Sequence, residues 1–251
     1  MEISAPSANS RLSKGARGRR FVVVLVVLTV AIFGFWNSRE KSVEAPEIST
    51  VLSAQVEQSE LAIVALGRIA IKGRAPNNDY ERDNFGAGWA TIAGCDTRNR
   101  ILERDLQNVV KQEGNCVVGS GTLDDPYTAK RIEFSRGEGT SSAVQIDHVV
   151  ALSDAWQKGA AVLTAEQREA FANDQLNLLA VDGPTNIKKS DSDAASWLPP
   201  NKSYRCRYVA RQIAVKLKYA LWVTRSEYDA VARVLSTCPS QVLPVYVDGA
   251  N

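Results

Sequence analysis

The chain has 251 residues, of which 45% are hydrophobic and 23% charged, a composition that is ordinary for a globular protein. The formal net charge of +2 arises at the N-terminus, because residues 1–36 contain five basic residues and one acidic residue. The remainder is slightly acidic, which excludes nucleic-acid binding by net charge alone. Any nucleic-acid site would need a local basic face.

The N-terminal sequence is typical of membrane targeting. Residues 1–20 are small, polar and basic, and we expect them to be disordered. Residues 21–36 are an uncharged apolar run preceded by KGARGRR, which fits either a signal peptide or a membrane anchor. The sequence after the run lacks a small-residue cleavage pattern, which favours the anchor. The basic residues before it favour a cytoplasmic N-terminus with the rest of the chain outside the cytoplasm. Residues 37–60 are predicted to be a linker.

Residues 61–251 are predicted to form one domain. Residues 61–71 are apolar and fit either a short helix or a strand, and residues 74–89 are rich in turn formers. Asp96 can cap a helix that continues to about Gln112, because apolar residues recur at helical spacing after it.

Alternating apolar residues and flanking turn residues predict strands in the middle of the chain. We expect strands over residues 116–123, 130–135, 142–152 and 176–181. The sequence DGPT at residues 182–185 predicts a turn that ends the last of these strands.

The helices of the C-terminal half carry recognisable start signals. The pairs Thr164/Gln167 and Thr224/Glu227 each have the spacing of a capping box, so each predicts a helix start. We expect helices over residues 154–160, 165–174, 204–223 and 225–236. A further helix is predicted to begin near Asn186, or after the Asp-Ser-Asp sequence at 191–193, and to end before Pro199.

The four cysteines predict two disulfides, because an exported chain with an even number of cysteines usually pairs them. Sequence alone allows three pairings. We favour Cys206–Cys238, since two antiparallel helices would bring them together, and Cys95–Cys116. The second pairing requires the chain to fold back, because a helix of 16 residues between them would be about 24 Å long. One histidine and no C-x-x-C pair do not supply the usual zinc ligands.

One group of residues has the chemistry of phosphodiester hydrolysis. His148, the only histidine, follows Asp147, and Asn177, Asn186 and Lys189 come some tens of residues later. Histidine can act as a general base near neutral pH. The oxygens of Asp147 and Asn186 suit Mg²⁺, which needs few protein ligands. Asp147 and His148 point to opposite faces of an ideal strand, so the strand must twist or end there for both to serve one site.

These motifs resemble a nuclease family. The pattern IDHVV…LNLLAV…TNIKK is similar to HNH nucleases, also called His-Me finger or ββα-metal nucleases. Over residues 80–238, sequences such as CDTRNRILERDL, SGTLDDPYT and SWLPPN resemble exported bacterial HNH proteins related to the C-terminal nuclease domain of GmrSD restriction enzymes.

The resemblance implies an α+β fold with a ββα-metal core and surrounding helices. It also implies one divalent metal ion, Mg²⁺ or Mn²⁺, and no organic cofactor. His148 would be the general base, Asp147 and Asn186 the metal ligands, and Asn177 the residue that braces the ββα turn. Asn186 stands where the more familiar pattern has a third-position histidine.

A local basic face supports nucleic acid as the partner, DNA more than RNA. Residues 183–225 contain nine Lys or Arg against Asp191 and Asp193, which we expect to be solvated or to cap a helix. The candidate phosphate contacts are Lys188, Lys189, Arg211 and Arg98, the last with a structural ion pair as its alternative. No base-reading motif is present, so little sequence preference is expected. The alternatives are a non-catalytic nucleic-acid-binding or surface-interaction module and a phosphodiesterase for small diesters. The oligomeric state stays open.

Overall fold

The computed structural model describes residues 60–114 and 116–244, which belong to one compact unit, Ala54–Asn251. The predicted disordered segment, the apolar run at 21–36 and most of the linker lie outside the described residues. Among the helices that are described, none is long and apolar enough to cross a membrane.

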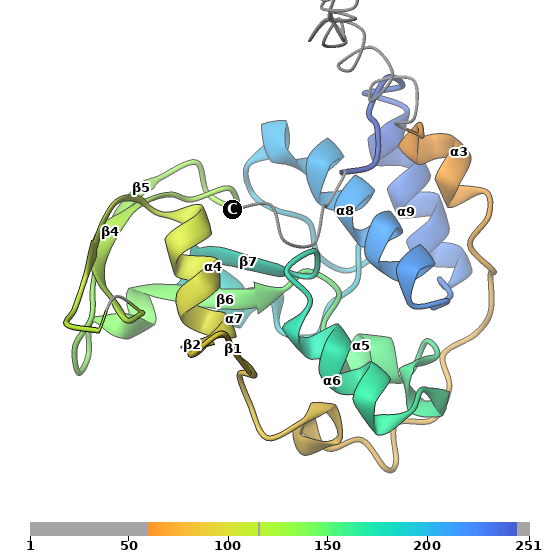
Figure 1. Cartoon of the computed structure of the whole chain (residues 1–251). Coiled ribbons are helices and arrows are strands. Elements are labelled where there is room, and N and C mark those ends of the chain that lie inside the picture. Colours follow the sequence, from red (N-terminus) through yellow and green to blue (C-terminus); the bar gives the residue numbers. More distant parts are fainter. Residues whose placement is uncertain (1–59, 115, 245–251) are drawn as a thin grey trace, which may run out of the picture. The chain divides into compact units, whose positions relative to one another are not determined.

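The described chain combines helices with three small antiparallel sheets, which confirms the α+β class (Figure 1). The strands are β1 (Thr91–Ile92), β2 (Cys95–Asp96), β3 (Gln107–Lys111), β4 (Val118–Asp124), β5 (Arg131–Ser135), β6 (Val144–His148) and β7 (Leu178–Asp182). The α-helices are α3 (Ala62–Leu66), α4 (Thr97–Asp105), α5 (Leu152–Trp156), α6 (Ala165–Asn173), α7 (Gly183–Lys189), α8 (Arg205–Lys218) and α9 (Arg225–Leu235). Short 3-10 helices are η1 (Arg82–Phe85), η2 (Ser141–Ala143), η3 (Ala160–Val162) and η4 (Lys202–Tyr204).

The helix predicted to reach Gln112 is shorter. Asp96 caps α4 by accepting from the backbone N–H of Asn99 at 2.7 Å, but the helix ends at Asp105. The chain then turns back as β3 and pairs with β4. This return brings the Cα atoms of Cys95 and Cys116 to 5.4 Å, so the predicted disulfide forms.

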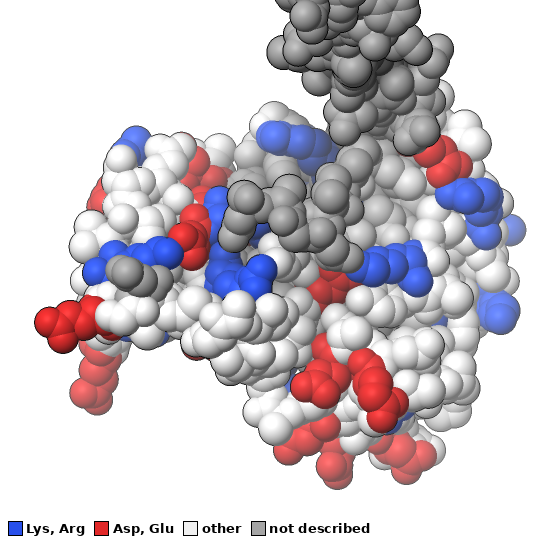
Figure 2. Space-filling view, viewed as in Figure 1, with Lys and Arg blue, Asp and Glu red and all other residues white. Residues whose placement is uncertain are grey.

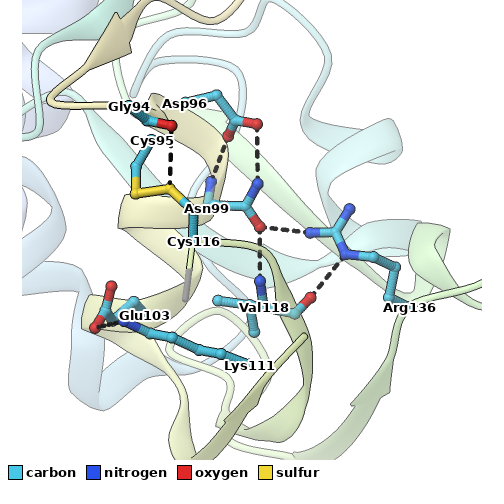
Figure 3. Close-up of a disulfide and its surroundings, with 9 residues drawn as sticks. All are labelled: Gly94, Cys95, Asp96, Asn99, Glu103, Lys111, Cys116, Val118 and Arg136. Carbon is cyan, nitrogen blue, oxygen red and sulfur yellow. Dashed lines mark hydrogen bonds and ion pairs between the residues drawn. A yellow bond between two sulfur atoms is a disulfide. The ribbon is translucent and has the colours of Figure 1, made fainter. Parts of the chain in front are cut away.

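The side chain of Asn99 ties α4 to the three-stranded sheet (Figure 3). Its Oδ1 accepts from the backbone N–H of Val118 at 2.9 Å and from Arg136 at 2.6 Å. Arg136 also donates to the carbonyl of Val118 at 2.7 Å. Because Asn99 is buried, these bonds satisfy polar groups that would otherwise be costly.

Strands β6 and β7 form a two-stranded ribbon that leads directly into α7. Asp147 lies opposite Leu179 and His148 opposite Leu178. The DGPT sequence forms the start of α7 instead of only the predicted turn after the strand. Asp182 is the N-cap, accepting from the backbone N–H of Thr185 at 2.8 Å, and a proline occupies the first turn. The predicted pair of strands is therefore followed by a helix that carries Asn186 in its middle.

The remaining helices pack around the ribbon in two groups. Helices α3, α8 and α9 share one buried cluster with Leu179 and Val181 of β7. Helices α5 and α6 lie side by side (Figure 1). They share a second buried cluster with Phe85 of η1. The Cα atoms of Cys206 and Cys238 are 6.4 Å apart, and their disulfide confirms the second predicted pairing.

A buried ionic network fastens the segment after α7 to α5, α8 and α9. The Lys158 ammonium lies 2.6–2.7 Å from the carboxylates of Asp154, Asp193 and Glu227. Lys216 lies 2.7 Å from Glu227. The expectation that Asp193 is solvated or a helix cap was wrong, because it is 3% exposed and pairs with buried Lys158.

The two predicted capping boxes have different outcomes. Thr164 and Gln167 form the complete box at the start of α6. Thr224 caps α9 by accepting from the backbone N–H of Glu227 at 3.1 Å. The Glu227 carboxylate instead lies in the buried ionic network, so only half of the second box forms.

Candidate active site

A cleft of about 450 Å³ opens beside the end of β6. Asp147, His148 and Asn186 all line it, together with Gln145. Asp147 and His148 both line the cleft although they are adjacent on β6, and both are buried.

The imidazole of His148 is held in a defined orientation. Its Nε2 lies 2.8 Å from the carbonyl oxygen of Ala172, and its ring stacks on Trp89 at 5.7 Å between centroids. Because a carbonyl only accepts hydrogen bonds, Nε2 carries the proton and Nδ1 keeps a lone pair. The pKa of His148 is lowered to about 3, mainly by burial and also by the charges of Arg82 and Lys189, and the hydrogen bond to Ala172 opposes this shift. The ring is therefore neutral near pH 7.

The Asp147 carboxylate is buried between two donors. Its Oδ1 accepts from the Lys189 ammonium at 2.9 Å, and its Oδ2 accepts from the Tyr127 hydroxyl. Burial raises the pKa of Asp147, and the Lys189 and Tyr127 contacts oppose that rise. Each carboxylate oxygen has two lone pairs, so acceptor capacity is left for a further partner.

Asn186 presents a free oxygen from α7. Its Nδ2 donates to Oε1 of Gln145 at 2.9 Å, and among the described residues its Oδ1 accepts no hydrogen bond. Asp147 and Asn186 thus offer two hard oxygen donors in one cleft, which fits a Mg²⁺ ion that keeps several waters. No group of three or more His, Cys, Asp or Glu residues is arranged to hold a metal in residues 60–114 and 116–244.

Asn177 joins the two strands of the ribbon where they separate. Its side chain accepts from the backbone N–H of Val150 at 2.8 Å and donates to the carbonyl of the same residue at 3.2 Å. Its own carbonyl accepts from Val149 at 2.7 Å. Asn177 is fully buried and therefore shapes the chain after His148 without reaching the cleft.

The candidate phosphate contacts are placed very differently from one another. Lys188 is exposed, and Arg98 lines the cleft and donates to the carbonyl of Val144 at 3.2 Å. Lys189 is fully buried against Asp147. Arg211 donates to the carbonyls of Gln175, Leu176 and Leu178, so it fastens the chain before β7. Neither Lys189 nor Arg211 lines the cleft, so neither is placed to make the predicted phosphate contact there.

The predicted basic face on the long helix is also smaller than expected. Lys216 is buried in the ionic network, and Lys218 lies 2.8 Å from Asp174. On the face that Figure 2 shows, Lys and Arg lie in small separate groups rather than in one continuous patch. Charge counting failed because it treats every Lys and Arg as solvent-exposed.

Three residues of the site could not be assigned to it from the sequence. Trp89 and Arg82 reach the cleft from the segment expected to be a loop, and Tyr127 reaches Asp147 from the DDPYT turn. The only earlier signal was the position of Tyr127 within the motif SGTLDDPYT, which supports the family resemblance.

Comparison with known proteins supplies the family. Residues 96–234, more than half of the chain, match the model of the C-terminal domain of GmrSD restriction endonucleases. The chain belongs to this family. The match begins at the cap of α4 and ends in α9, so it contains Asp147, His148, Asn177 and Asn186.

One relative is similar over most of its length. A protein of Arthroderma benhamiae described as an uncharacterized secreted protein is 39% identical over 196 residues, which cover 77% of this chain and 90% of that protein. That relative is fungal, so the comparison does not support the bacterial source expected from the resemblance. No solved structure matches the chain.

Proposed function

We propose that this protein is a secreted, divalent-metal-dependent endonuclease of the HNH type. The ribbon β6–β7 followed by α7 would be its ββα-metal core. One observation carries the proposal: His148, whose Nε2 is bound by the carbonyl of Ala172, lines the same cleft as Asp147 and Asn186, in a chain whose family is named for restriction endonucleases.

His148 would act as the general base. Its Nε2–H is fixed by the carbonyl of Ala172, so Nδ1 is the atom that takes a proton from water. The oxygen of that water then forms a bond to phosphorus, and the P–O bond to the leaving group breaks. A pKa of about 3 in the free protein makes His148 a weak base. A phosphodiester anion in the cleft would favour the imidazolium and raise this pKa.

Asp147 and Asn186 would hold the metal ion, Mg²⁺ or Mn²⁺. When bound, such an ion stabilises negative charge on phosphate and leaving oxygens. The Lys189 ammonium keeps the Asp147 carboxylate ionised and oriented. It also repels a second cation, so metal affinity should be modest.

Arg98 and Arg82 would contact the phosphate backbone. Both line the cleft, and neither forms an ion pair with a carboxylate among the described residues. Burial and the nearby Arg136 lower the pKa of Arg98, and the charge of Asp96 opposes this shift. A phosphate anion would further stabilise the charged guanidinium. Such contacts carry little sequence information, which supports weak sequence preference.

The place of action would be outside the cytoplasm. Two disulfides form in the described chain, and the Arthroderma relative is described as secreted. Retention by a membrane anchor at residues 21–36 remains a separate proposal. DNA is the preferred polymer of the proposal, and RNA is the second.

The alternative is a module that keeps this fold and binds nucleic acid without turnover. One assay gives different results for the endonuclease and for the binding module. The full-length protein is incubated with plasmid DNA, linear DNA and RNA in Mg²⁺, in Mn²⁺ and in chelator. Cleavage that requires a metal and is lost in Asn186→Ala supports the endonuclease. Binding without cleavage in either metal favours the module, and hydrolysis of a small diester alone would indicate a small-molecule phosphodiesterase.

A further inference from the structure

A second cavity, of about 210 Å³, adjoins the cleft at His148. The two cavities share four lining residues: Arg82, Trp89, His148 and Leu152. The remaining wall of the second cavity comes mainly from residues 83–88. A molecule that placed its phosphate beside His148 could therefore extend a neighbouring group into this cavity.

Three residues with planar rings contribute to the wall of the cavity. Phe85, Trp89 and His148 all line it, and Phe85 is only 1% exposed. A volume of about 210 Å³ lies below the roughly 300–1,000 Å³ of sites for drug-sized molecules. The space suits one planar ring system rather than a whole nucleotide.

The rim of the cavity offers polar groups for the edge of such a ring. Within the described residues, the peptide groups of Ala87 and Gly88 make no hydrogen bonds to the rest of the chain. The Asp83 side chain also lines the cavity, is exposed and forms no ion pair with a described residue. Free peptide donors and acceptors beside aromatic walls are the features by which proteins bind unpaired bases.

The segment that builds this cavity is fixed in place. Arg168 donates to the carbonyl of Asn84 at 2.7 Å, and the backbone N–H of Ala90 donates to the side chain of Asn173 at 2.8 Å. Both bonds anchor the segment to α6. Residues 82–89 precede the part of the chain that matches the family, which begins at residue 96. Most of the cavity wall therefore lies outside the part of the chain that the family model matches.

We propose that the second cavity binds one nucleobase next to the scissile phosphate, so that the enzyme prefers single-stranded nucleic acid. This inference rests on the proposed nuclease function. A base inside a duplex is stacked and paired, and it must leave the helix before it can enter a pocket. A single strand avoids that cost. The base would lie against the rings, with its edge at Ala87, Gly88 and Asp83.

The test compares cleavage of one sequence as a single strand, as a duplex and as a single strand with an abasic site beside the cut. We expect kcat/KM to be higher for the single strand than for the duplex by about tenfold or more. The abasic site should lower kcat/KM by about tenfold, in line with the loss of one stacked base.

Two variants separate the base site from the catalytic cleft. Ala87 lines only the second cavity, so Ala87→Leu should lower kcat/KM on the intact strand and leave the abasic strand unchanged. Ala165→Leu, at the exposed first residue of α6, is the matched control and should change neither.

The outcomes distinguish the two proposals. Equal cleavage of single strand and duplex, with Ala87→Leu behaving like Ala165→Leu, overturns the base site and leaves the nuclease standing. If nothing is cleaved, the nuclease proposal fails. Binding in chelator then decides the base site, because fluorescence anisotropy should still show tighter binding of the intact strand than of the abasic strand. Equal binding would overturn the base site too.

Discussion

The substitution Lys189→Met tests whether this lysine neutralises Asp147, as the structure indicates, or binds phosphate, as the sequence suggested. The Lys189 ammonium is fully buried, 2.9 Å from Oδ1 of Asp147 and 2.9 Å from the carbonyl of His148. At that separation, two charges attract by about 6 kcal/mol at an effective dielectric constant of about 20. Methionine keeps the length of the side chain and removes the charge.

The expected loss in the free energy of unfolding is smaller than this attraction, because the variant no longer has to desolvate a lysine. Removing one partner of a buried pair typically costs about 3–5 kcal/mol. The Tyr127 hydroxyl still donates to Asp147, so we expect Lys189→Met to lower the free energy of unfolding by about 3 kcal/mol. Without the ammonium, the folded-state pKa of Asp147 rises further above its unfolded value. The variant then gains stability as pH falls, and its deficit should be larger at pH 8 than at pH 5.

The assay is urea denaturation followed by tryptophan fluorescence at both pH values. Lys188→Met is the matched control, because Lys188 is the exposed preceding residue of the same helix. Its free energy of unfolding should stay within about 0.5 kcal/mol of the wild type. If the two variants unfolded at the same urea concentration, Lys189 would not be the buried counter-ion of Asp147.

Three further predictions concern stability. Folding lowers the pKa of His148 from 6.5 to about 3, so the unfolded chain binds more protons between these values. This contribution to stability therefore falls by about 1.6 kcal/mol from pH 6.5 to pH 5. His148→Ala should remove that pH slope in urea titrations, and an unchanged slope would contradict the burial of the ring. A Cβ at Gly183 would lie 2.0 Å from the carbonyl oxygen of Ser142. Because overpacking costs about 1–3 kcal/mol, Gly183→Ala should lower the thermal midpoint by several degrees. An unchanged midpoint would mean that the segments around Gly183 and Ser142 do not touch. Replacing Cys206 and Cys238 by serine should cost about 3–4 kcal/mol through the freed loop, and a loss below 1 kcal/mol measured by denaturation would argue against this crosslink.

Local patterns predicted the ribbon and most helices well. The β6 and β7 strands and the start of α6 follow alternation and capping signals that act within a few residues. The end of α4 was missed because Leu106 and Val109 continue a helical spacing. The β-branched pair Val109 and Val110 favours a strand, and pairing with β4 prevails there.

The start of α7 was missed although its signals were present. Asp182 followed by Gly183 and Pro184 was interpreted as a turn. The same residues fit a helix start, with Asp as the N-cap and proline in the first turn. Such a sequence serves both structures, and only the packing against β6 decides between them.

Contacts between distant segments were beyond the sequence patterns. The motif indicated that Asp147, His148 and Asn186 act together, and they line one cleft. It could not show that Tyr127 and Trp89 reach the same residues, because those contacts depend on how separate turns fold over β6. The burial of Lys189 could not be predicted from the sequence for the same reason.

The most direct test of the proposed site is the single-turnover rate of metal-dependent cleavage by the wild type and by His148→Ala, with thermal melting to establish that the variant is folded. A general base contributes about 10²–10⁴-fold. We therefore predict a loss of at least about a hundredfold in the folded variant. Equal rates in the two proteins would remove His148 from the mechanism and contradict the account of this cleft.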